Sequence, residues 1–507
     1  MSETHETICS SDVTADSRHP CRNVAVAESD RRAKMRRLRA EGVDPFPHGA
    51  VHGRTPIGAI DGSDLTLLTG EHSEYQYSVA GRLIARRSHG MSSFLDLEDQ
   101  SGTIQLYLRS DTLGTELYHW SLGLDIGDIL EAEGCIYVTL RNQVALGVKR
   151  VILLAKSLLP PPARYHGVKN RGNRYRYREL DLMASSAVRR LFGVRAEAIR
   201  AIRDWMNEHG YMEIESPVLH SDTSGASARP FCTYHNALGR ELSLRISTEL
   251  HLKRCVVGGL EKVYELGKCF RNEGISRRHS PEFTMLEWVC GYSDYVEVAV
   301  FTEEMIAAVA QRALGSTCIE CCGEIVDLAK PWRRTTVRDV VSEVVGVDIA
   351  CTTSRELMTL IQKDDGRDDW PQAVRSVYSK LVEPTLIQPT MVFDFPVDMS
   401  LHAKRHRQEP KLAEQFDAVI GGVELATGNS ELNDPDEQRG KFCEQSGKSD
   451  ATRGDLSANE AGYVRALEYG LLPCAGAGMG VDRLLMILTG HESLREIVLF
   501  PILRDDE

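Results

Sequence analysis

The chain has 507 residues, of which 42% are hydrophobic and 26% are charged, and its formal net charge is −13. This length exceeds one ordinary hydrophobic core, so we expect two or three globular domains. The sequence has no apolar run long enough to span a membrane and no secretion signal, and its 13 cysteines are scattered. These features argue against a membrane protein or a disulfide-bonded secreted protein, and they favour a cytoplasmic location.

The N-terminal part of the chain is polar. Residues 1–30 show neither helical nor strand periodicity, which predicts a disordered tail. Residues 31–72 are expected to form a basic helix and a connection. Local basic stripes, rather than total charge, decide contact with phosphate groups. The basic side chains of the predicted helix are Arg31, Arg32, Lys34, Arg36, Arg37 and Arg39.

Residues 73–158 contain five segments rich in strand-forming residues, separated by turn-forming residues, and a short helix is expected near 111–121. Five strands with one helix are typical of an OB-fold β-barrel, which binds single-stranded nucleic acid by stacking bases on aromatic side chains. Successive prolines at 160–162 end this domain, because they cannot continue a strand ladder. Residues 159–180 are predicted to be a basic linker. The predicted strands are 75–87, 93–97, 103–108, 128–139 and 144–154.

The predicted second domain, residues 181–507, begins with an amphipathic helix at 185–209 and a strand at 211–217. Two further strands, 263–270 and 283–289, are joined by a basic loop. Because side chains two residues apart on a strand share a face, Arg271 and Glu273 point the same way. A guanidinium fixed on a strand suits an anionic phosphoryl group.

Two glycine-containing segments follow. The segment 416–425 predicts a hairpin that turns at Gly421 and Gly422, so that Asp417 and Glu424 project from one side of the ribbon, where they could bind a metal ion. Residues 476–480 have glycine at alternate positions and precede an apolar helix. This spacing differs from the dinucleotide fingerprint, and the chain has no Walker A sequence, which argues against Rossmann and P-loop nucleotide sites.

The run from Phe270 through Arg271-Asn-Glu-Gly-Ile-Ser to Glu287 resembles motif 2 of the class II aminoacyl-tRNA synthetases, and its wording is most similar to lysyl-tRNA synthetase. Residues 185–217 and 476–488 resemble motifs 1 and 3, in the family's order. The resemblance implies an α+β protein, in which an N-terminal five-stranded OB-fold anticodon-binding barrel precedes a catalytic domain built on an antiparallel sheet flanked by helices. It also implies a homodimer that forms through motif 1.

The resemblance further implies that the enzyme activates lysine with ATP and Mg²⁺ and transfers it to tRNA. The implied catalytic residues are Arg271 and Arg483. The implied ATP contacts are Arg271, Glu273, His279, Phe283 and Arg483. The implied lysine contacts are Gly225, Glu249, Arg271, Glu287 and Glu431. The implied metal ligands are Asp417 and Glu424, and the implied anticodon contacts are Arg87, Phe94 and Gln105.

Three positions depart from the lysyl enzymes that the chain resembles: Val289 stands in place of a tyrosine, Thr427 in place of an asparagine, and Asn429 in place of an aromatic residue. A second hypothesis is therefore a paralogue that activates a lysine analogue or has a biosynthetic or resistance role. A third hypothesis is a tRNA-binding protein without catalytic activity. That hypothesis predicts loss of the catalytic arginines, but Arg271 and Arg483 are both present.

Overall fold

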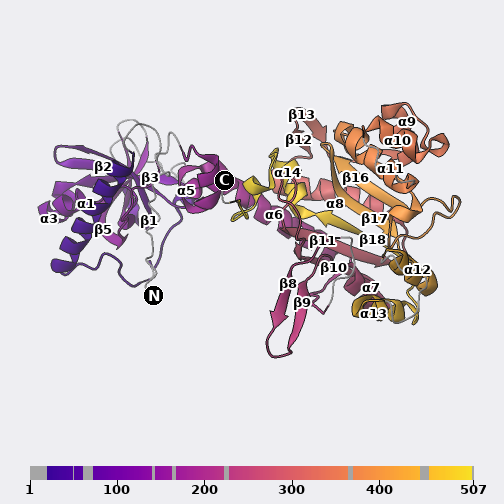
Figure 1. The fold of residues 1–507 in the computed structure, drawn as a ribbon. Coiled ribbons are helices and arrows are strands. Elements are labelled where there is room, and N and C mark those ends of the chain that lie inside the picture. Colours follow the sequence, from indigo (N-terminus) through magenta and orange to yellow (C-terminus); the bar gives the residue numbers. More distant parts are fainter. Residues whose placement is uncertain are drawn as a thin grey trace. The chain divides into compact units, whose positions relative to one another are not determined.

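The computed structural model of the chain describes residues 20–49, 51–60, 72–139, 143–162, 167–221, 228–362, 369–445 and 456–504. The architecture is α+β, as predicted, and the chain divides into two units, residues 1–186 and 187–507 (Figure 1). Among the described residues, no helix combines the length and the apolar composition that crossing a bilayer requires.

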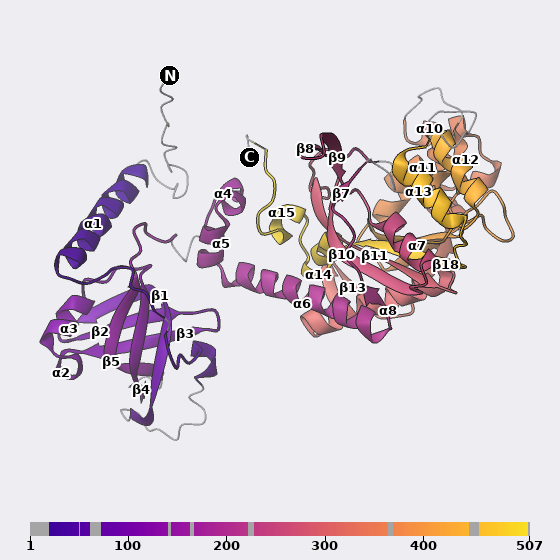
Figure 2. The same ribbon diagram turned by 90° about the horizontal axis from the view of Figure 1, so that it is seen from below.

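The first unit contains the predicted five-stranded barrel, closed in the order β1-β2-β3-β5-β4 (Figure 2). Alternate side chains point into it: on β2 these include Leu95 and Leu97, which are buried, while Phe94 and Asp96 face outward. The predicted helix near 111–121 is present as two short helices. The bounds are β1 His72–His89, β2 Ser92–Glu98, β3 Thr103–Arg109, α2 Ser110–Leu113, α3 Thr115–Ser121, β4 Ile129–Val138 and β5 Val144–Ala155, and a 3₁₀ turn, η1, spans Ile57–Ala59.

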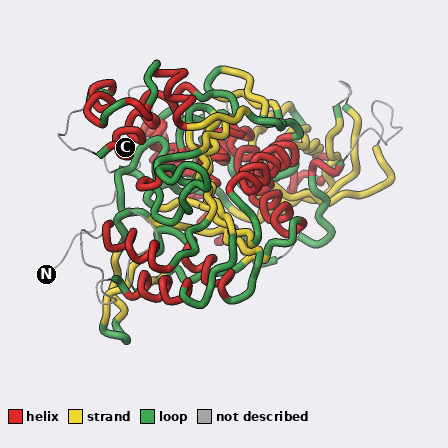
Figure 3. Tube along the Cα trace, turned by 90° about the vertical axis from the view of Figure 1, so that its right-hand side faces the viewer, coloured by secondary structure: helices red, strands yellow, loops and turns green. Residues whose placement is uncertain are grey.

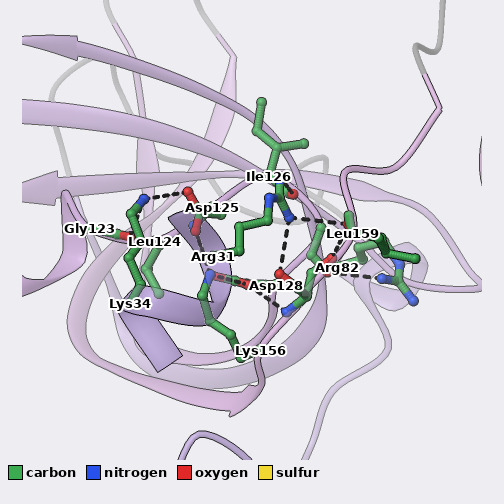
Figure 4. Close-up of polar contacts among 12 residues, drawn as sticks. Arg31, Lys34, Arg82, Gly123, Leu124, Asp125, Ile126, Asp128, Lys156 and Leu159 are labelled. Atoms are coloured by element: carbon green, nitrogen blue, oxygen red, sulfur yellow. Dashed lines mark hydrogen bonds and ion pairs between the residues drawn. The ribbon is translucent and has the colours of Figure 1, made fainter. Parts of the chain in front are cut away.

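Helix α1, Pro20–Ala40, is fastened to the barrel unit by polar contacts (Figure 4). Lys34 pairs with Asp125 at 2.6 Å, and Leu38 packs into the barrel's apolar core. Arg31 is buried, and its guanidinium donates to three main-chain oxygens. These oxygens belong to Ile126, at 2.9 Å, Ser157, at 3.1 Å, and Leu159, at 3.2 Å.

The helix begins earlier than we predicted, because residues 20–30 were assigned to a disordered tail and the structure places them in α1. The contacts that hold α1 against the barrel lie at residues 31–38. The first turns of the helix therefore need no apolar face, and their sequence shows no helical periodicity from which the helix could be predicted. The predicted tail residues 1–19 lie outside the described residues.

The predicted linker, 159–180, is a second difference. It contains helix α4, Arg171–Arg176, and the start of helix α5, Arg178–Ala184. Arg178 is buried and pairs with Asp181 at 3.0 Å, so this stretch is structured rather than extended. The first of the two compact units ends after α5, at Ser186.

The second unit is built on an eight-stranded sheet in the order β14-β15-β16-β17-β18-β11-β10-β6. Figure 3 shows the strands of the protein in yellow and its helices in red. Adjacent strands of this sheet are antiparallel, as predicted, except for the outermost pairs β14–β15 and β10–β6, which are parallel. The bounds are β6 Met212–Glu213, β10 Lys262–Phe270, β11 Glu282–Gly291, β14 Arg333–Thr336, β15 Thr390–Phe393, β16 Gln415–Ile420, β17 Val423–Ser430 and β18 Cys474–Gly480.

Two predicted segments take a different form here. The strand expected at 211–217 is limited to the two residues of β6, which pair with Val263 and Tyr264. The glycine-rich run at 476–480 is part of the central strand β18, which lies between β17 and β11. Glycine has low strand propensity, so only its partners on both sides specify this strand.

The remaining elements surround this sheet. The helices are α6 Ser186–Glu208, α7 Glu249–Val257, α8 Tyr295–Leu314, α9 Val337–Val345, α10 Ser354–Leu360, α11 Trp370–Val377, α12 Pro435–Gln445, α13 Ala458–Leu467, α14 Val481–Thr489 and α15 Leu494–Ile497. A three-stranded sheet comprises β7 Leu219–His220, β9 Arg240–Leu244 and β8 Cys232–His235, and a hairpin comprises β12 Cys318–Cys321 and β13 Glu324–Asp327. Short turns are η2 Ile349–Cys351, η3 Tyr378–Val382, η4 Glu383–Thr385 and η5 Val397–Met399.

The two faces of the large sheet have different partners. Leu286 and Trp288 of β11 join the apolar cluster formed with α6, α8 and α14. Val289, which alternates with them, belongs to a second cluster with α7, α12 and α13, and Glu287 shares its face. Because the second group of helices covers only part of its face, polar side chains of the central strands can line a cavity there.

Candidate active site

A cavity of about 590 Å³ lies over the central strands of the second unit. Its lining includes eight residues that the sequence predicted for one site: Glu249, Arg271, Glu273, His279, Phe283, Asp417, Glu424 and Arg483. Two more predicted residues, Glu287 and Glu431, are buried, with exposed fractions of 6% and 4%. Gly225 lies outside the described residues. The structure therefore gathers groups that are far apart in the sequence.

Arg271 follows β10, where its backbone N–H donates to the carbonyl of Pro281 at 2.8 Å and closes the end of the β10–β11 hairpin. Its guanidinium carbon lies 5.2 Å from the centre of the Phe283 ring. Its Nε is buried and has no hydrogen-bond partner within the described part of the chain. A partly buried guanidinium that lines a cavity and keeps a donor unused is suited to bind an anion.

Arg483 lies in the first turn of α14, and its Nη1 donates to the Glu424 carbonyl at 2.7 Å. The preceding residue, Asp482, was missed by the sequence analysis. Its buried carboxylate accepts from Arg195 and from the backbone N–H of Thr284, both at 2.7 Å. Asp482 therefore fixes α14 against β11 and α6, and it positions Arg483 and the neighbouring Phe283. In the sequence, an acidic residue directly before the predicted catalytic Arg483 was the available sign that Asp482 could position it.

The loop between β10 and β11 carries the other two predicted nucleotide contacts. His279 Nδ1 lies 2.9 Å from Ser276 Oγ, and partial burial and the nearby Arg483 lower the pKa of His279. Glu273 is exposed at the rim of the cavity. Because its pKa is lowered, the His279 imidazole is neutral near pH 7, so one ring nitrogen can donate a hydrogen bond and the other can accept one.

Glu249 and Glu431 are held by a lysine that the sequence analysis did not single out. Lys253 is completely buried, and its Nζ lies 2.6 Å from Glu249 Oε1 and 2.5 Å from Glu431 Oε2. Asn429 Nδ2 donates to the same Glu431 oxygen at 2.7 Å. Glu249 lines the cavity, whereas Glu431 lies deeper, so the ion network runs from the cavity into the protein.

Glu287 is the third buried carboxylate of this region. It accepts hydrogen bonds from Ser247 Oγ at 2.8 Å and from the Thr248 N–H at 2.6 Å, and also from the Thr248 hydroxyl. Burial raises the pKa of Glu287, and these hydrogen bonds oppose that rise. Three donors at one carboxylate compensate for much of its lost hydration.

The glycines of β18 make room for these carboxylates. A Cβ at Gly476 would lie 2.7 Å from Glu431 Oε1 and 2.7 Å from the Trp288 carbonyl oxygen. A Cβ at Gly478 would lie 2.6 Å from the Met285 methyl group. The alternating glycines at this strand therefore serve close approach of the neighbouring strands and their side chains, not a phosphate-binding loop.

The predicted hairpin is formed by β16 and β17, and Val419 pairs with Glu424, as predicted. A bulge between Ala418 and Val419 shifts the register beyond that pair. Asp417 is buried, and its Oδ1 has no hydrogen-bond partner among the described residues. Burial and the like charge of Glu424 raise the pKa of Asp417 to about 8. Glu383, which the sequence analysis missed, also lines the cavity and accepts from the Glu424 N–H at 3.1 Å.

The three departures from the family pattern lie in or beside this site. Thr427 and Asn429 line the cavity, and Val289 is buried in the apolar cluster beneath it together with Tyr463. The Tyr463 hydroxyl is buried and makes no hydrogen bond to the described residues.

His402 is a further lining residue that the sequence analysis missed. Its Nδ1 lies 3.2 Å from Gln438 Oε1, and burial lowers the pKa of His402 to about 4. The ring is therefore neutral near pH 7.

The first unit carries an outward-facing aromatic stack. The Phe94 and Tyr107 rings lie 4.9 Å apart, and Tyr107 lies 5.2 Å from Tyr137. Beside the stack, Asp96 accepts from Arg87 at 3.1 Å and from Gln105 at 3.3 Å. The structure thus brings the three predicted anticodon residues onto one surface, and it adds Tyr107, Tyr137 and Asp96, whose alternation on the strands was the available signal.

Comparisons with known proteins show the family to which both units are similar. Residues 170–504 match the family model described as tRNA synthetases class II (D, K and N), and residues 77–154 match the OB-fold nucleic acid binding domain. A lysine–tRNA ligase of Moorella thermoacetica is 42% identical over 95% of the chain and 99% of its own length. A lysine–tRNA ligase of Gloeobacter violaceus is also 42% identical, over 95% of the chain and 99% of its own length. One of Dehalococcoides mccartyi is 39% identical, over 94% of the chain and 96% of its own length.

Proposed function

The chain belongs to the class II tRNA synthetases, and we propose that it is a lysine–tRNA ligase, which activates lysine with ATP and transfers it to the 3′ end of lysine tRNA. The observation that supports this most directly is one cavity that joins two arginines to a group of carboxylates. The relatives named above share the chain's full two-domain length, so both domains contribute to the proposal.

In the proposed reaction, the lysine carboxylate attacks the α-phosphate of ATP and pyrophosphate leaves. The protein contributes positions and charge rather than covalent chemistry. Arg271, with its unused buried donor, holds the attacking carboxylate against the α-phosphate. Phe283 provides an apolar face for adenine, while Glu273 and His279 contact the nucleotide from the loop. Arg483 binds the terminal phosphates with its other N–H donors, while Nη1 donates to the Glu424 carbonyl and holds the side chain in place.

Asp417 and Glu424 would hold Mg²⁺, a hard cation that prefers oxygen ligands and usually keeps few protein ligands beside the substrate phosphates. The fit is supported by the buried Oδ1 of Asp417, which has no hydrogen-bond partner among the described residues, and by Glu424, which lines the same cavity. Bound there, the ion would supply neutralisation of phosphate charge.

The carboxylates select the amino acid. We propose that Glu249 binds the α-amino group, with the backbone of Gly225, and that Glu287 and Glu431 bind the side-chain amine. An uncharged analogue would leave buried carboxylates without a cation, which is strongly unfavourable, so the pocket can reject such analogues without an editing site.

The barrel is proposed to bind the anticodon. Phe94 would stack on a base, and Arg87 and Gln105, both held by Asp96, would contact the same nucleotide region. We also propose a homodimer, because the motif 1 region and the three-stranded sheet that follows it expose apolar side chains, including Met212, Leu219 and Tyr234. A cytoplasmic location is consistent with the unpaired cysteines of the described residues.

The two other hypotheses receive less support. Relatives near 40% identity over almost the whole chain carry the name lysine–tRNA ligase, which favours lysine over an analogue despite the three departures. A protein without catalytic activity would not need Arg271 and Arg483 in one cavity, yet both line it.

The test is lysine-dependent exchange between pyrophosphate and ATP, followed by aminoacylation of lysine tRNA. The Arg271→Ala variant should lose exchange while it binds tRNA nearly as well as the wild type. Arg277→Ala is the matched control, because Arg277 lies in the same loop with its side chain 75% exposed. Wild-type protein that shows no exchange with lysine would exclude the proposed function.

A further inference from the structure

Lys253 occupies an unusual place for a lysine. It lies on α7, one turn after Glu249, and its side chain has no exposed surface. Its ammonium joins Glu249, which lines the cavity, to Glu431, which lies behind the cavity wall. Burial of an ammonium costs several kcal/mol unless anions accompany it, so this lysine and its two carboxylates form one structural unit.

The ammonium and the two carboxylates stabilise each other's charged forms. Burial lowers the pKa of Lys253, but Glu249 and Glu431 outweigh it and raise that pKa above its usual range. Burial raises the pKa of Glu249, but Lys253 outweighs it and the pKa of Glu249 is lowered. At Glu431 burial outweighs the ammonium of Lys253 and raises the pKa of that carboxyl to about 7, although the ammonium limits the rise. The lysine therefore favours ionised carboxylates in a region that would otherwise protonate them.

The charge balance of the pocket follows from this arrangement. Three carboxylates, Glu249, Glu287 and Glu431, and one ammonium leave a net charge of minus two when all are ionised. Free lysine carries two ammonium groups, and its carboxylate is assigned to Arg271. A pocket with minus two charges therefore matches the two ammonium groups, whereas three uncompensated carboxylates would not.

We propose that Lys253 is a positioning residue for amino-acid recognition, which aims Glu249 and Glu431 and sets the pocket's charge to that of a substrate with two ammonium groups. This inference rests on the proposed function. Lys253 does not itself touch the substrate, because it is enclosed, and it acts through the two carboxylates that it binds.

The other groups that face this network are neutral near pH 7. Burial raises the pKa of the Tyr463 hydroxyl on α13 and of the Cys474 thiol on β18, and burial lowers the pKa of His402. Asn429 carries no charge. If the ammonium were removed, Glu249 and Glu431 would thus lose their nearest cation, and their pKa values would rise. Lysine binding would then weaken as the pH falls, because the protonated carboxyls cannot pair with an ammonium.

The experiment measures pyrophosphate exchange at varied lysine concentration between pH 6 and 9 for the wild type, Lys253→Met and Lys253→Arg. We expect Lys253→Met to lose roughly a hundredfold in kcat/KM for lysine, as for removal of one member of a buried ion pair. Its KM for ATP should change less than about threefold, because Lys253 is remote from the nucleotide contacts. Its KM for lysine should fall as the pH rises, and this fall should be steeper and extend to higher pH than in the wild type, where Lys253 holds down the pKa values of Glu249 and Glu431.

Lys156→Met is the matched control. Lys156 is also buried and pairs with two carboxylates, Asp125 at 2.6 Å and Asp128 at 2.9 Å, but it belongs to the barrel unit (Figure 4). This variant should lose thermal stability and keep the wild-type KM and pH profile for lysine. If Lys253→Met and Lys156→Met change the KM for lysine and its pH profile alike, the effect is a general one of removing a buried lysine, and the proposal is overturned.

Folded Lys253→Met protein with the wild-type KM for lysine and the wild-type pH profile would also overturn it. If Lys253→Met does not fold, Lys253→Arg decides. A retained cation should keep the wild-type pH profile while altered geometry raises the KM for lysine, and a pH profile shifted to higher pH would overturn the proposal. Wild-type protein without lysine-dependent exchange would instead contradict the proposed function, so the two failures can be told apart.

Discussion

The Gly476→Ala substitution tests whether close packing around Glu431 determines lysine binding. The added Cβ would lie 2.7 Å from Glu431 Oε1, 2.7 Å from the Trp288 carbonyl oxygen and 3.2 Å from a Val289 methyl group. The Trp288 carbonyl belongs to a strand adjacent to β18, so it cannot move freely. Overpacking of this kind costs about 1–3 kcal/mol. If displacement of the Glu431 carboxylate weakens the binding free energy of lysine by this amount, the KM for lysine rises roughly five- to 150-fold.

The assay is pyrophosphate exchange with lysine and ATP varied separately, together with a thermal melt. The KM for ATP should stay within about threefold of the wild type, because the added methyl group meets no residue assigned to the nucleotide. Gly440→Ala on α12 is the control, since a Cβ there meets nothing within 4 Å. Stable Gly476→Ala protein with an unchanged KM for lysine would refute the idea that β18 needs glycine to accommodate Glu431.

Two further predictions concern other parts of the molecule. Phe94→Ala should remove a stacking surface worth about 1–3 kcal/mol, and it should raise the KM for tRNA in aminoacylation without changing lysine-dependent exchange. Tyr75→Ala removes an exposed aromatic side chain of the same barrel and should change neither quantity. Equal effects of the two substitutions would contradict the assignment of Phe94. The pKa of His402 is lowered to about 4, so the unfolded chain binds a proton below pH 6.5 that the folded protein does not, and stability is lost as the pH falls through this window. His402→Leu should remove about 2 kcal/mol of the stability lost between pH 7.5 and 5, measured by urea unfolding, and an unchanged pH dependence would disprove this contribution.

The sequence predicted the elements whose local pattern and tertiary role agree. The barrel strands alternate apolar and polar residues, and the β16–β17 hairpin has its glycine pair at the turn, so both were predicted nearly at their observed bounds. The bulge after Ala418 was not predicted, because nothing in the residues themselves marks the extra position. Strand β18 was not predicted either, since its glycines are specified by the side chains of neighbouring strands rather than by their own propensity.

The candidate site was predicted through motif resemblance, and its supporting residues were largely missed. Asp482, His402 and Lys253 act through partners that are distant in the sequence, which lie on β11, on α12 and directly after β17 respectively. For Lys253, the four-residue spacing from Glu249 was a usable signal, but on a helix that spacing more often marks an exposed ion pair. Only burial distinguishes the two cases, and burial comes from the assembled fold.

The way in which α1 is fastened to the barrel unit has a consequence for how the protein tolerates mutation. Arg31 recognises three main-chain oxygens, which remain in place whatever side chains residues 126, 157 and 159 carry. Substitutions at those three positions can therefore accumulate without loosening the helix, provided that the backbone keeps its course. The same attachment has no substitute at residue 31, because no other side chain offers a planar set of donors wide enough to reach all three oxygens.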